Sequence, residues 1–150
     1  HRDLHSFPTR RSSDLKNLLF LTYDGVDQQF VAALEKETGK TRWLTKRTYK
    51  SGQKTPSKPN DNRKSYATPT IIEHNGRKQL ISPAAEATYS YDPSSGKELW
   101  FIRHGKGYGY NVTCRPIYRH GLVFTNSGIS KNLFAIDPSG SGDVTDTHIR

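Results

Sequence analysis

An internal repeat is the feature of this 150-residue chain that most constrains its fold. The segment at residues 30–43 reads FVAALEKETGKTRW, and the segment at residues 88–100 reads TYSYDPSSGKELW. Both contain an alternating stretch, an acidic residue, a polar turn with Gly, a Lys directly after this Gly, and a Trp. The Gly and Trp positions recur at an offset of 57 residues, as Gly39 and Gly96 and as Trp43 and Trp100. Because one repeat of this length cannot bury its apolar faces alone, the chain is expected to stack such units.

A third copy, NLFAIDPSGSG, follows the second at an offset of 45 residues and does not reach a Trp. The turn chemistry is clearest in the second copy. Pro93 supplies the backbone angle that a type I turn needs at its second position, and Gly96 can adopt the left-handed conformation that closes a hairpin with a bulge. Asp92 can accept hydrogen bonds from the turn amides that follow it, and Asp137 repeats this position. The motif therefore predicts a tight hairpin in each copy.

Each full unit is expected to contain four short strands, near residues 70–73, 78–82, 87–92 and 97–102 in the second copy. Four-stranded units spaced by 45 to 57 residues are typical of β-propeller blades. The chain has room for about three blades, whereas a closed ring needs about four to eight. The sequence therefore predicts an all-β fold, an incomplete β-propeller of about three four-stranded antiparallel blades. The missing blades are expected in a longer chain, and Trp residues are expected to fill the seams between blades.

The pattern Ala-x-Asp-x-x-(Thr/Ser)-Gly-Lys-x-x-Trp resembles the repeat of quinoprotein-like β-propellers. It is carried by ALEKETGKTRW at 33–43, SYDPSSGKELW at 90–100 and AIDPSGSG at 135–142, so the resemblance covers nearly all of residues 18–142. The Gly-His and Trp-Asp pairs of WD40 repeats do not occur. The resemblance implies that six positions stabilise blades, namely Gly39, Trp43, Asp92, Gly96, Trp100 and Asp137.

Two classes of protein share this repeat. One comprises dehydrogenases that bind pyrroloquinoline quinone (PQQ) and Ca²⁺ on the ring axis, typically with an adjacent Cys pair and a catalytic Asp. The other comprises non-enzymatic propellers, including BamB-type assembly factors of bacterial outer membranes. Cys114 is the only Cys and cannot form such a pair, and both Trp occupy blade positions.

We therefore expect a non-catalytic scaffold for other proteins or peptides, in the periplasm or cell envelope, with no catalytic, cofactor-binding or metal-binding residue in this part. The alternative is a fragment of a PQQ- and Ca²⁺-dependent dehydrogenase.

Residues 1–15, HRDLHSFPTRRSSDL, have a different origin. They match without exception the translation of a DNA string that resembles a widely used sequencing-library adapter, so we interpret them as an artefact with no native fold. Their first letters also match the kinase catalytic-loop pattern H-R-D-L-x-x-x-N, but Pro8 stands where this pattern needs the metal-binding Asn. Asp3 is therefore not a catalytic base. Residues 16–150 are interpreted as the partial propeller.

The chain is basic, because removing the three Arg and two Asp of this segment lowers the formal net charge only from +9 to +8. Lys residues gather at 48–66, where two Pro and few apolar side chains predict a long inter-blade loop. This loop lacks interleaved aromatic residues, so no nucleic-acid partner is expected. No apolar run approaches the roughly 18 residues of a membrane span, so no transmembrane segment is expected.

The segment GKGYGYN at 105–111 lacks the third Gly of a dinucleotide-binding motif and is interpreted as a loop on the propeller rim. Its Lys106, Tyr108 and Tyr110 form a candidate partner-binding surface. Three further residues have side chains of the types that bind zinc, namely His104, Cys114 and His120. They lack a fourth ligand and the usual close pairing, so we interpret them as surface His residues and a buried Cys.

Overall fold

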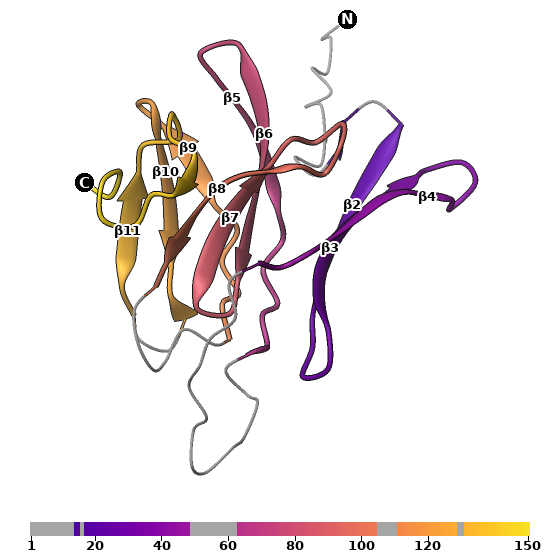
Figure 1. Cartoon of the computed structure of the whole chain (residues 1–150), viewed down its shortest axis with the longest axis horizontal. Coiled ribbons are helices and arrows are strands. Elements are labelled where there is room, and N and C mark those ends of the chain that lie inside the picture. The colour runs from indigo at the N-terminus through magenta and orange to yellow at the C-terminus, as the bar shows by residue number, and fades with distance from the viewer. Residues whose placement is uncertain (1–13, 16, 49–62, 105–110, 129–130) are drawn as a thin grey trace, which may run out of the picture.

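The computed structural model describes residues 14–15, 17–48, 63–104, 111–128 and 131–150, which form an all-β structure of three sheets (Figure 1). The first sheet contains β1 (Asp14–Leu15), β2 (Leu18–Asp24), β3 (Gln29–Glu35) and β4 (Thr41–Lys46), in this order. The central sheet contains β5 (Thr70–His74), β6 (Arg77–Ala84), β7 (Ala87–Tyr91) and β8 (Glu98–Arg103), with β12 (Gly142–Asp143) beside β8. The third sheet contains β9 (Ile117–Arg119), β10 (Leu122–Asn126) and β11 (Leu133–Ile136).

The central sheet confirms the predicted four-strand unit, because β5 to β8 coincide closely with the four predicted strands and pair as an antiparallel meander. The third sheet differs from the prediction of four strands, since it has three among the described residues. After β11 the chain crosses to the central sheet, where Gly142 and Asp143 pair in parallel with Trp100 and Phe101. It then returns to the third sheet through a bridge between Ile149 and Ile136. This crossing covers the outer edge of β8, which otherwise presents unpaired backbone groups.

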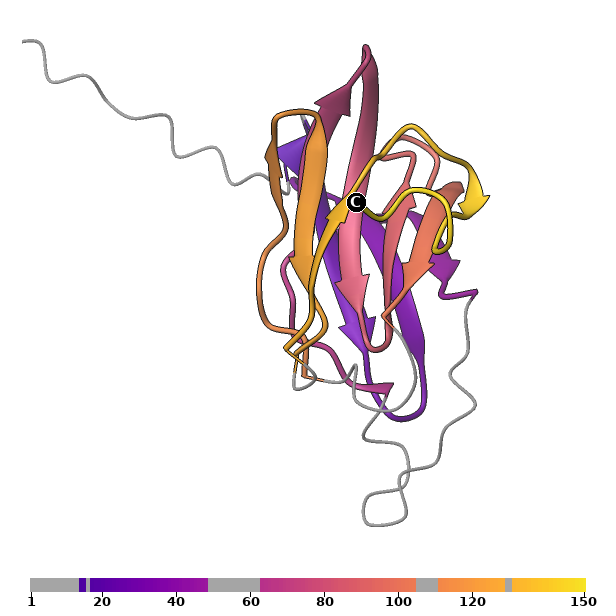
Figure 2. The same ribbon diagram turned by 90° about the vertical axis from the view of Figure 1, so that its left-hand side faces the viewer.

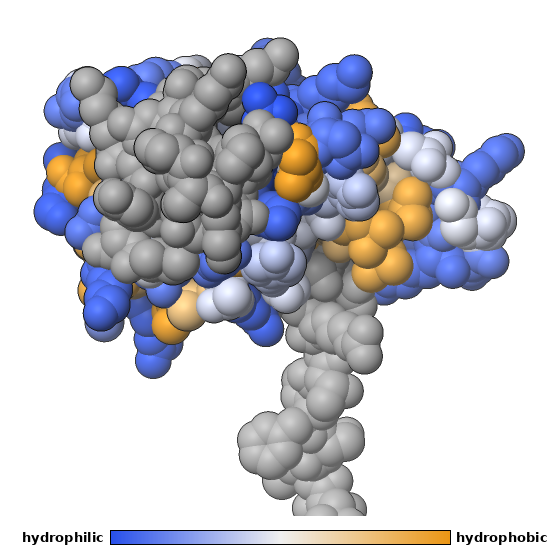
Figure 3. Space-filling model, turned by 90° about the horizontal axis from the view of Figure 1, so that it is seen from below, coloured by the Kyte–Doolittle hydropathy of each residue, from blue (hydrophilic) through white to orange (hydrophobic). Residues whose placement is uncertain are grey.

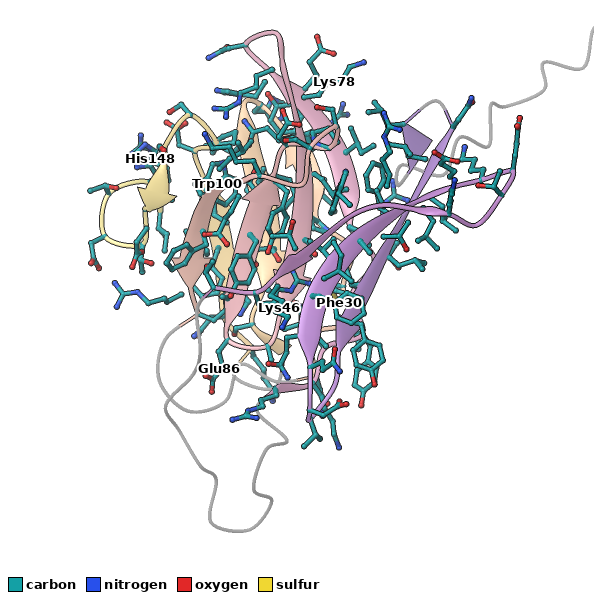
Figure 4. All side chains as sticks on the ribbon, turned by 45° about the vertical axis from the view of Figure 1, so that its right-hand side comes forward. Phe30, Lys46, Lys78, Glu86, Trp100 and His148 are labelled. Atoms are coloured by element: carbon teal, nitrogen blue, oxygen red, sulfur yellow. The ribbon has the colours of Figure 1, made fainter. Side chains whose placement is uncertain are left out.

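The three sheets stack face to face, with the central sheet in the middle (Figures 1 and 2). One apolar cluster joins the first and central sheets and includes Val31, Ala33, Tyr89 and Tyr91. A second cluster joins the central and third sheets and is centred on Trp100, which is fully buried within the stack (Figure 4). All five residues of β7 are buried, because the alternating side chains of this strand face both neighbouring sheets.

The repeat motif forms the seam between the first two sheets. The carboxylate of Asp92 accepts hydrogen bonds from the backbone amides of Ser94 and Ser95, each at 2.9 Å, so the predicted turn is confirmed. Gly96 has a φ of 75°, and the register shifts between Ser90 and Tyr91, as expected of a bulged hairpin. Trp43 of β4 covers this turn, and its indole N–H donates to the carbonyl of Pro93 at 3.1 Å.

The second seam repeats this connection through one additional side chain. The indole N–H of Trp100 donates to the side-chain oxygen of Gln79 at 2.8 Å, and the amide nitrogen of Gln79 donates to the carbonyl of Pro138 at 2.9 Å. Pro138 occupies in the third copy the place of Pro93 in the second. Both Trp residues therefore lie in seams between sheets, as predicted, and each connects one sheet to the turn of the next.

Two predictions concern segments that the structure describes only in part. Residues 1–13 and 49–62 lie outside the described residues, so the interpretation of residues 1–15 as an artefact and the loop at 48–66 stay predictions. Within the first of these segments, Asp14 and Leu15 are described and pair with β2 as β1. At the start of the loop at 48–66, the hydroxyl of Thr48 donates to the carboxylate of Glu98 at 2.7 Å. In the described part of the chain, no helix is long and apolar enough to cross a membrane.

Gly96 and Gly39 provide a matched test of the first seam. Both have a positive φ, 75° and 70°, but a Cβ on Gly96 would lie 2.5 Å from the indole of Trp43, whereas a Cβ on Gly39 would meet nothing within 4 Å. We expect Gly39→Ala to lower the free energy of unfolding by about 1 kcal/mol through backbone strain. Gly96→Ala is expected to lower it by about 1–3 kcal/mol more, through overpacking. Urea unfolding of both variants measures this difference in the free energy of unfolding. Equal losses in the two variants would contradict the packing of Trp43 against the turn at Gly96.

Candidate functional site

A groove between the central and third sheets is the candidate binding site. It has a volume of about 660 Å³ and lies where β5 and β9 form the edges of their sheets. Its walls are the starts of these two strands with the residues just before β9. The lining residues are Thr70, Ile71, Ile72, Glu73, Arg115, Pro116, Ile117 and Tyr118.

Hydrogen bonds between the two walls hold the groove in shape. The hydroxyl of Thr70 donates to the carbonyl of Pro116 at 3.2 Å, and Nε of Arg115 donates to the same hydroxyl at 3.2 Å. At the other end, Nδ1 of His74 and the hydroxyl of Tyr118 lie 3.0 Å apart. The side chains that give the groove its walls therefore come from both sheets.

The surface of the groove combines apolar side chains with charges of both signs. Ile117 is 62% exposed, and Ile71 is half-buried. Glu73 and Arg115 are exposed beside them. An apolar centre with a polar rim is typical of surfaces that bind other proteins. Among the described residues, β5 and β9 each pair with one neighbouring strand, so their other edges are ones that extended peptides can join.

The most deeply buried ion pair among the described residues lies in the first seam. Arg47 follows β4 and Asp24 ends β2, and both nitrogens of a fork on Arg47 (Nε and Nη2) lie 3.0 Å from the two carboxylate oxygens of Asp24. The hydroxyl of Tyr91 accepts a further bond from Arg47 at 3.3 Å, and the guanidinium lies 5.0 Å from the centre of the Tyr89 ring. This cation is therefore bound by both sheets.

Burial raises the pKa of the Asp24 carboxyl, while the charge of Arg47 and its hydrogen bonds act in the opposite direction. Burial also raises the pKa of the Tyr91 hydroxyl to about 12, although Arg47 lowers it. Burial acts to lower the pKa of the Arg47 guanidinium, but the charge of Asp24, together with the hydrogen bonds, outweighs this effect, so the pKa is raised. Both side chains are buried, and Arg47 joins the first sheet to the central sheet.

His104 occupies the place of Arg47 in the next copy, at the same offset of 57 residues. The backbone N–H of Arg47 donates to the carbonyl of Gln29 at 3.0 Å, and that of His104 donates to the carbonyl of Glu86 at 2.7 Å, so the two positions are structurally equivalent. His104 is buried in the second seam, where its ring stacks on Phe134 at 5.2 Å. Burial lowers the pKa of His104 to about 3, so the ring is neutral.

Two interpretations from the sequence need correction. His104 is buried rather than at the surface, because it follows β8 at the seam position. Cys114 is exposed rather than buried, since it precedes the edge strand β9, and its sulfur accepts a bond from the side chain of Asn126 at 3.1 Å. His120 lies exposed in the turn between β9 and β10, as predicted. Within the described ranges, no group of three or more His, Cys, Asp or Glu could hold a metal ion.

The structure brings the six predicted blade positions to turns and seams. Asp137 accepts bonds from the backbone amide of Ser139 and from Arg150, each at 3.0 Å, in a turn equivalent to that of Asp92. The predicted rim of Lys106, Tyr108 and Tyr110 lies outside the described residues and stays a prediction. Sequence reasoning missed the groove and the ion pair, although the 57-residue offset could have linked Arg47 to His104.

The sequence matches no protein-family model and no curated protein.

Removing one partner of the ion pair tests its role in the first seam. Asp24→Ala leaves the Arg47 charge buried without its carboxylate, and we expect the free energy of unfolding to fall by about 3–5 kcal/mol. The double variant Asp24→Leu with Arg47→Met removes both charges and should recover most of this loss. Urea unfolding measures both, with Asp27→Ala, an exposed carboxylate on the same turn, as the control. A loss as small as that of the control would show that the pair does not support the seam.

The buried His104 predicts a pH dependence. Its pKa is about 3 in the folded chain and about 6.5 when unfolded. Between these two pH values the unfolded chain binds more protons than the folded chain. The contribution of His104 to the free energy of unfolding is therefore fully present above about pH 6.5. It decreases as the pH falls towards 3, by up to about 1.4 kcal/mol per pH unit. Unfolding measured from pH 7 to 4 should show a shallower slope in His104→Gln. The exposed His120→Asn should keep the slope of the unmodified chain, and three equal slopes would refute the assignment.

Proposed function

We propose that the chain is part of a quinoprotein-like β-propeller that acts as a non-catalytic scaffold for other proteins or peptides, in the cell envelope. The groove between β5 and β9 is the observation that carries the binding role. It has apolar and charged side chains at an open surface, and two free strand edges border it. A partner that lies in it as an extended segment can pair with a strand edge and place alternate side chains against Ile71 and Ile117.

The propeller assignment is supported by the equivalence of the seams. Each seam connects a Trp to the Pro carbonyl of the following turn, directly in the first seam and through Gln79 in the second. Stacked sheets that follow one another in the chain and share such seams are the building principle of propellers. Under this proposal, the repeated motif stabilises blades, and binding depends on surfaces between them.

A peptide library tests the binding role. Random linear peptides displayed on phage are selected on the 150-residue chain, and the enriched peptides are then measured with two variants. Ile117→Asp places a charge in the apolar part of the groove, and we expect it to weaken binding at least about tenfold, as loss of a central contact does. Val26→Asp changes a comparably apolar residue that is 38% exposed on the turn between β2 and β3, and it should leave binding unchanged.

Two results would count against the proposal. If the peptides bind the Ile117→Asp variant with the same affinity as the unmodified chain, the binding surface does not include the groove. Reduction of an electron acceptor by the purified chain only in the presence of PQQ and Ca²⁺ would favour the dehydrogenase alternative instead. Circular dichroism checks that the Ile117→Asp variant is folded, as we expect because this side chain is 62% exposed.

A further inference from the structure

We propose that the groove between β5 and β9 selects extended peptides that carry an acidic and a basic side chain three residues apart, with apolar residues between them. The inference rests on the proposed function and goes beyond it by naming the chemistry of the partner. It follows from the two charged side chains that line the groove, Arg115 and Glu73. Both side chains, and the bonds that fix the two walls around them, lie within the described residues.

Arg115 places a cation at one end of the groove. Its Nε donates to the hydroxyl of Thr70 at 3.2 Å, and this hydroxyl donates in turn to the carbonyl of Pro116 at 3.2 Å. The exposed guanidinium is thereby held beside the start of β5. Its two terminal nitrogens have no acceptor among the described residues. A guanidinium with two such donors matches the two oxygens of a carboxylate, so this end of the groove suits an acidic side chain.

Glu73 places an anion towards the other end. It is exposed, and its carboxylate has no hydrogen bond or ion pair within the part of the chain that the structure describes. Lys78 lies opposite it in the register of β5 and β6, yet the two side chains form no ion pair. The next residue, His74, contacts the hydroxyl of Tyr118 at 3.0 Å, so this end of β5 is fixed against the third sheet. The groove therefore has one unpaired charge of each sign.

The geometry of β5 sets the spacing between the two charges. Arg115 is bonded to Thr70, and Thr70 and Glu73 are three residues apart, which is about 10 Å along a strand. Thr70 points towards the third sheet, whereas Ile71 packs against the cluster on the opposite side, and Glu73 shares the side of Ile71 because strand side chains alternate. In a peptide strand joined to the edge of β5, residues three apart also point to opposite sides. An acid and a base at this spacing can therefore reach both charges.

Apolar side chains lie between the two charges. Ile71 is half-buried between Thr70 and Glu73 in the sequence of β5, and Ile117 is 62% exposed on the other wall. An apolar centre with a charged rim is the usual arrangement of binding surfaces, so the residues between the acid and the base of the partner are expected to be apolar. The charges then select the partner, because a like charge opposite either of them is repelled.

Local pairing in the groove and the overall charge favour different partners. The chain has a formal net charge of +9, so attraction by net charge alone favours peptides with two acids. Figure 3 shows hydrophilic residues spread over much of the surface seen from below, among smaller apolar patches, so this attraction is not confined to one site. The groove contains one charge of each sign and favours one acid with one base. The peptides that bind therefore distinguish the two effects.

Selection of random linear peptides displayed on phage tests the inference, with the 150-residue chain and three variants as separate targets. Peptides enriched on the unmodified chain should carry an acid and a base three residues apart, in either order, because a strand can join in either direction. Arg115→Glu gives the groove two anions and should select two bases at this spacing, while Glu73→Lys gives it two cations and should select two acids. Arg119→Glu makes the same change in net charge at an exposed position outside the lining, so it should keep the mixed pair.

A synthetic peptide with the mixed pair gives a second measurement. Arg115→Glu should weaken its binding about three- to tenfold, as expected when an exposed ion pair becomes a repulsion. Replacing the acid of the peptide by Lys should restore the affinity for this variant, which shows that the variant is folded and that the two charges face each other. Sodium chloride at about 1 M should remove most of the difference, because charges are then screened beyond about 3 Å.

Three results would overturn the proposal. If the selected peptides lose affinity for Ile117→Asp but contain no charged pair at this spacing, the charge selection is wrong and the scaffold function stands. If Arg115→Glu and Glu73→Lys still select the mixed pair, residues other than these two recognise it. If no peptide binds, or if Ile117→Asp leaves binding unchanged, the proposed function fails and the inference fails with it.

Discussion

Burial of both faces of the central sheet is the constraint on which the rest of the structure depends. All side chains of β7 are buried, so this sheet requires an apolar partner on each side. The first sheet supplies one partner and the third sheet supplies the other. Because the three sheets are built from one repeat, each sheet has apolar side chains on both faces. Each of the two outer sheets therefore keeps one apolar face uncovered. The seams therefore explain both the stability of the core and the character of the outer surfaces.

Polar groups in the seams align the sheets. Apolar contact alone lets two sheets slide, whereas a buried hydrogen-bonding group accepts only a few positions. Gln79 connects Trp100 to Pro138, and the fork of Arg47 connects Asp24 to Tyr91. The equivalent positions Arg47 and His104 show two ways in which a polar side chain can be buried in a seam. The first seam buries a charge together with its counter-ion, while the second buries a ring that burial keeps neutral.

Under the proposed function, different residues would serve stability and binding. The motif residues are used in turns and seams, and none of them lines the groove between β5 and β9. In the proposed scaffold, the binding surface would lie where neighbouring sheets meet at their edges, so it could differ between proteins of the same fold. The covered edge of β8 and the free edges of β5 and β9 also show that one side of the central sheet is closed by its own chain.

The sequence by itself determined the all-β class, the strands of the central sheet and the turn of Asp92 and Gly96. These features depend on local chemistry, such as alternation, a left-handed Gly and an acceptor beside free amides. Only the tertiary structure decided the path of β12, the burial of His104, the exposure of Cys114, the ion pair and the groove. Each of these features depends on which segments, distant in the sequence, come into contact. The residue types alone do not predict these contacts. Asp24 and Arg47 illustrate the difference, since they are 23 residues apart in the chain and become partners only when β2 and β4 flank β3.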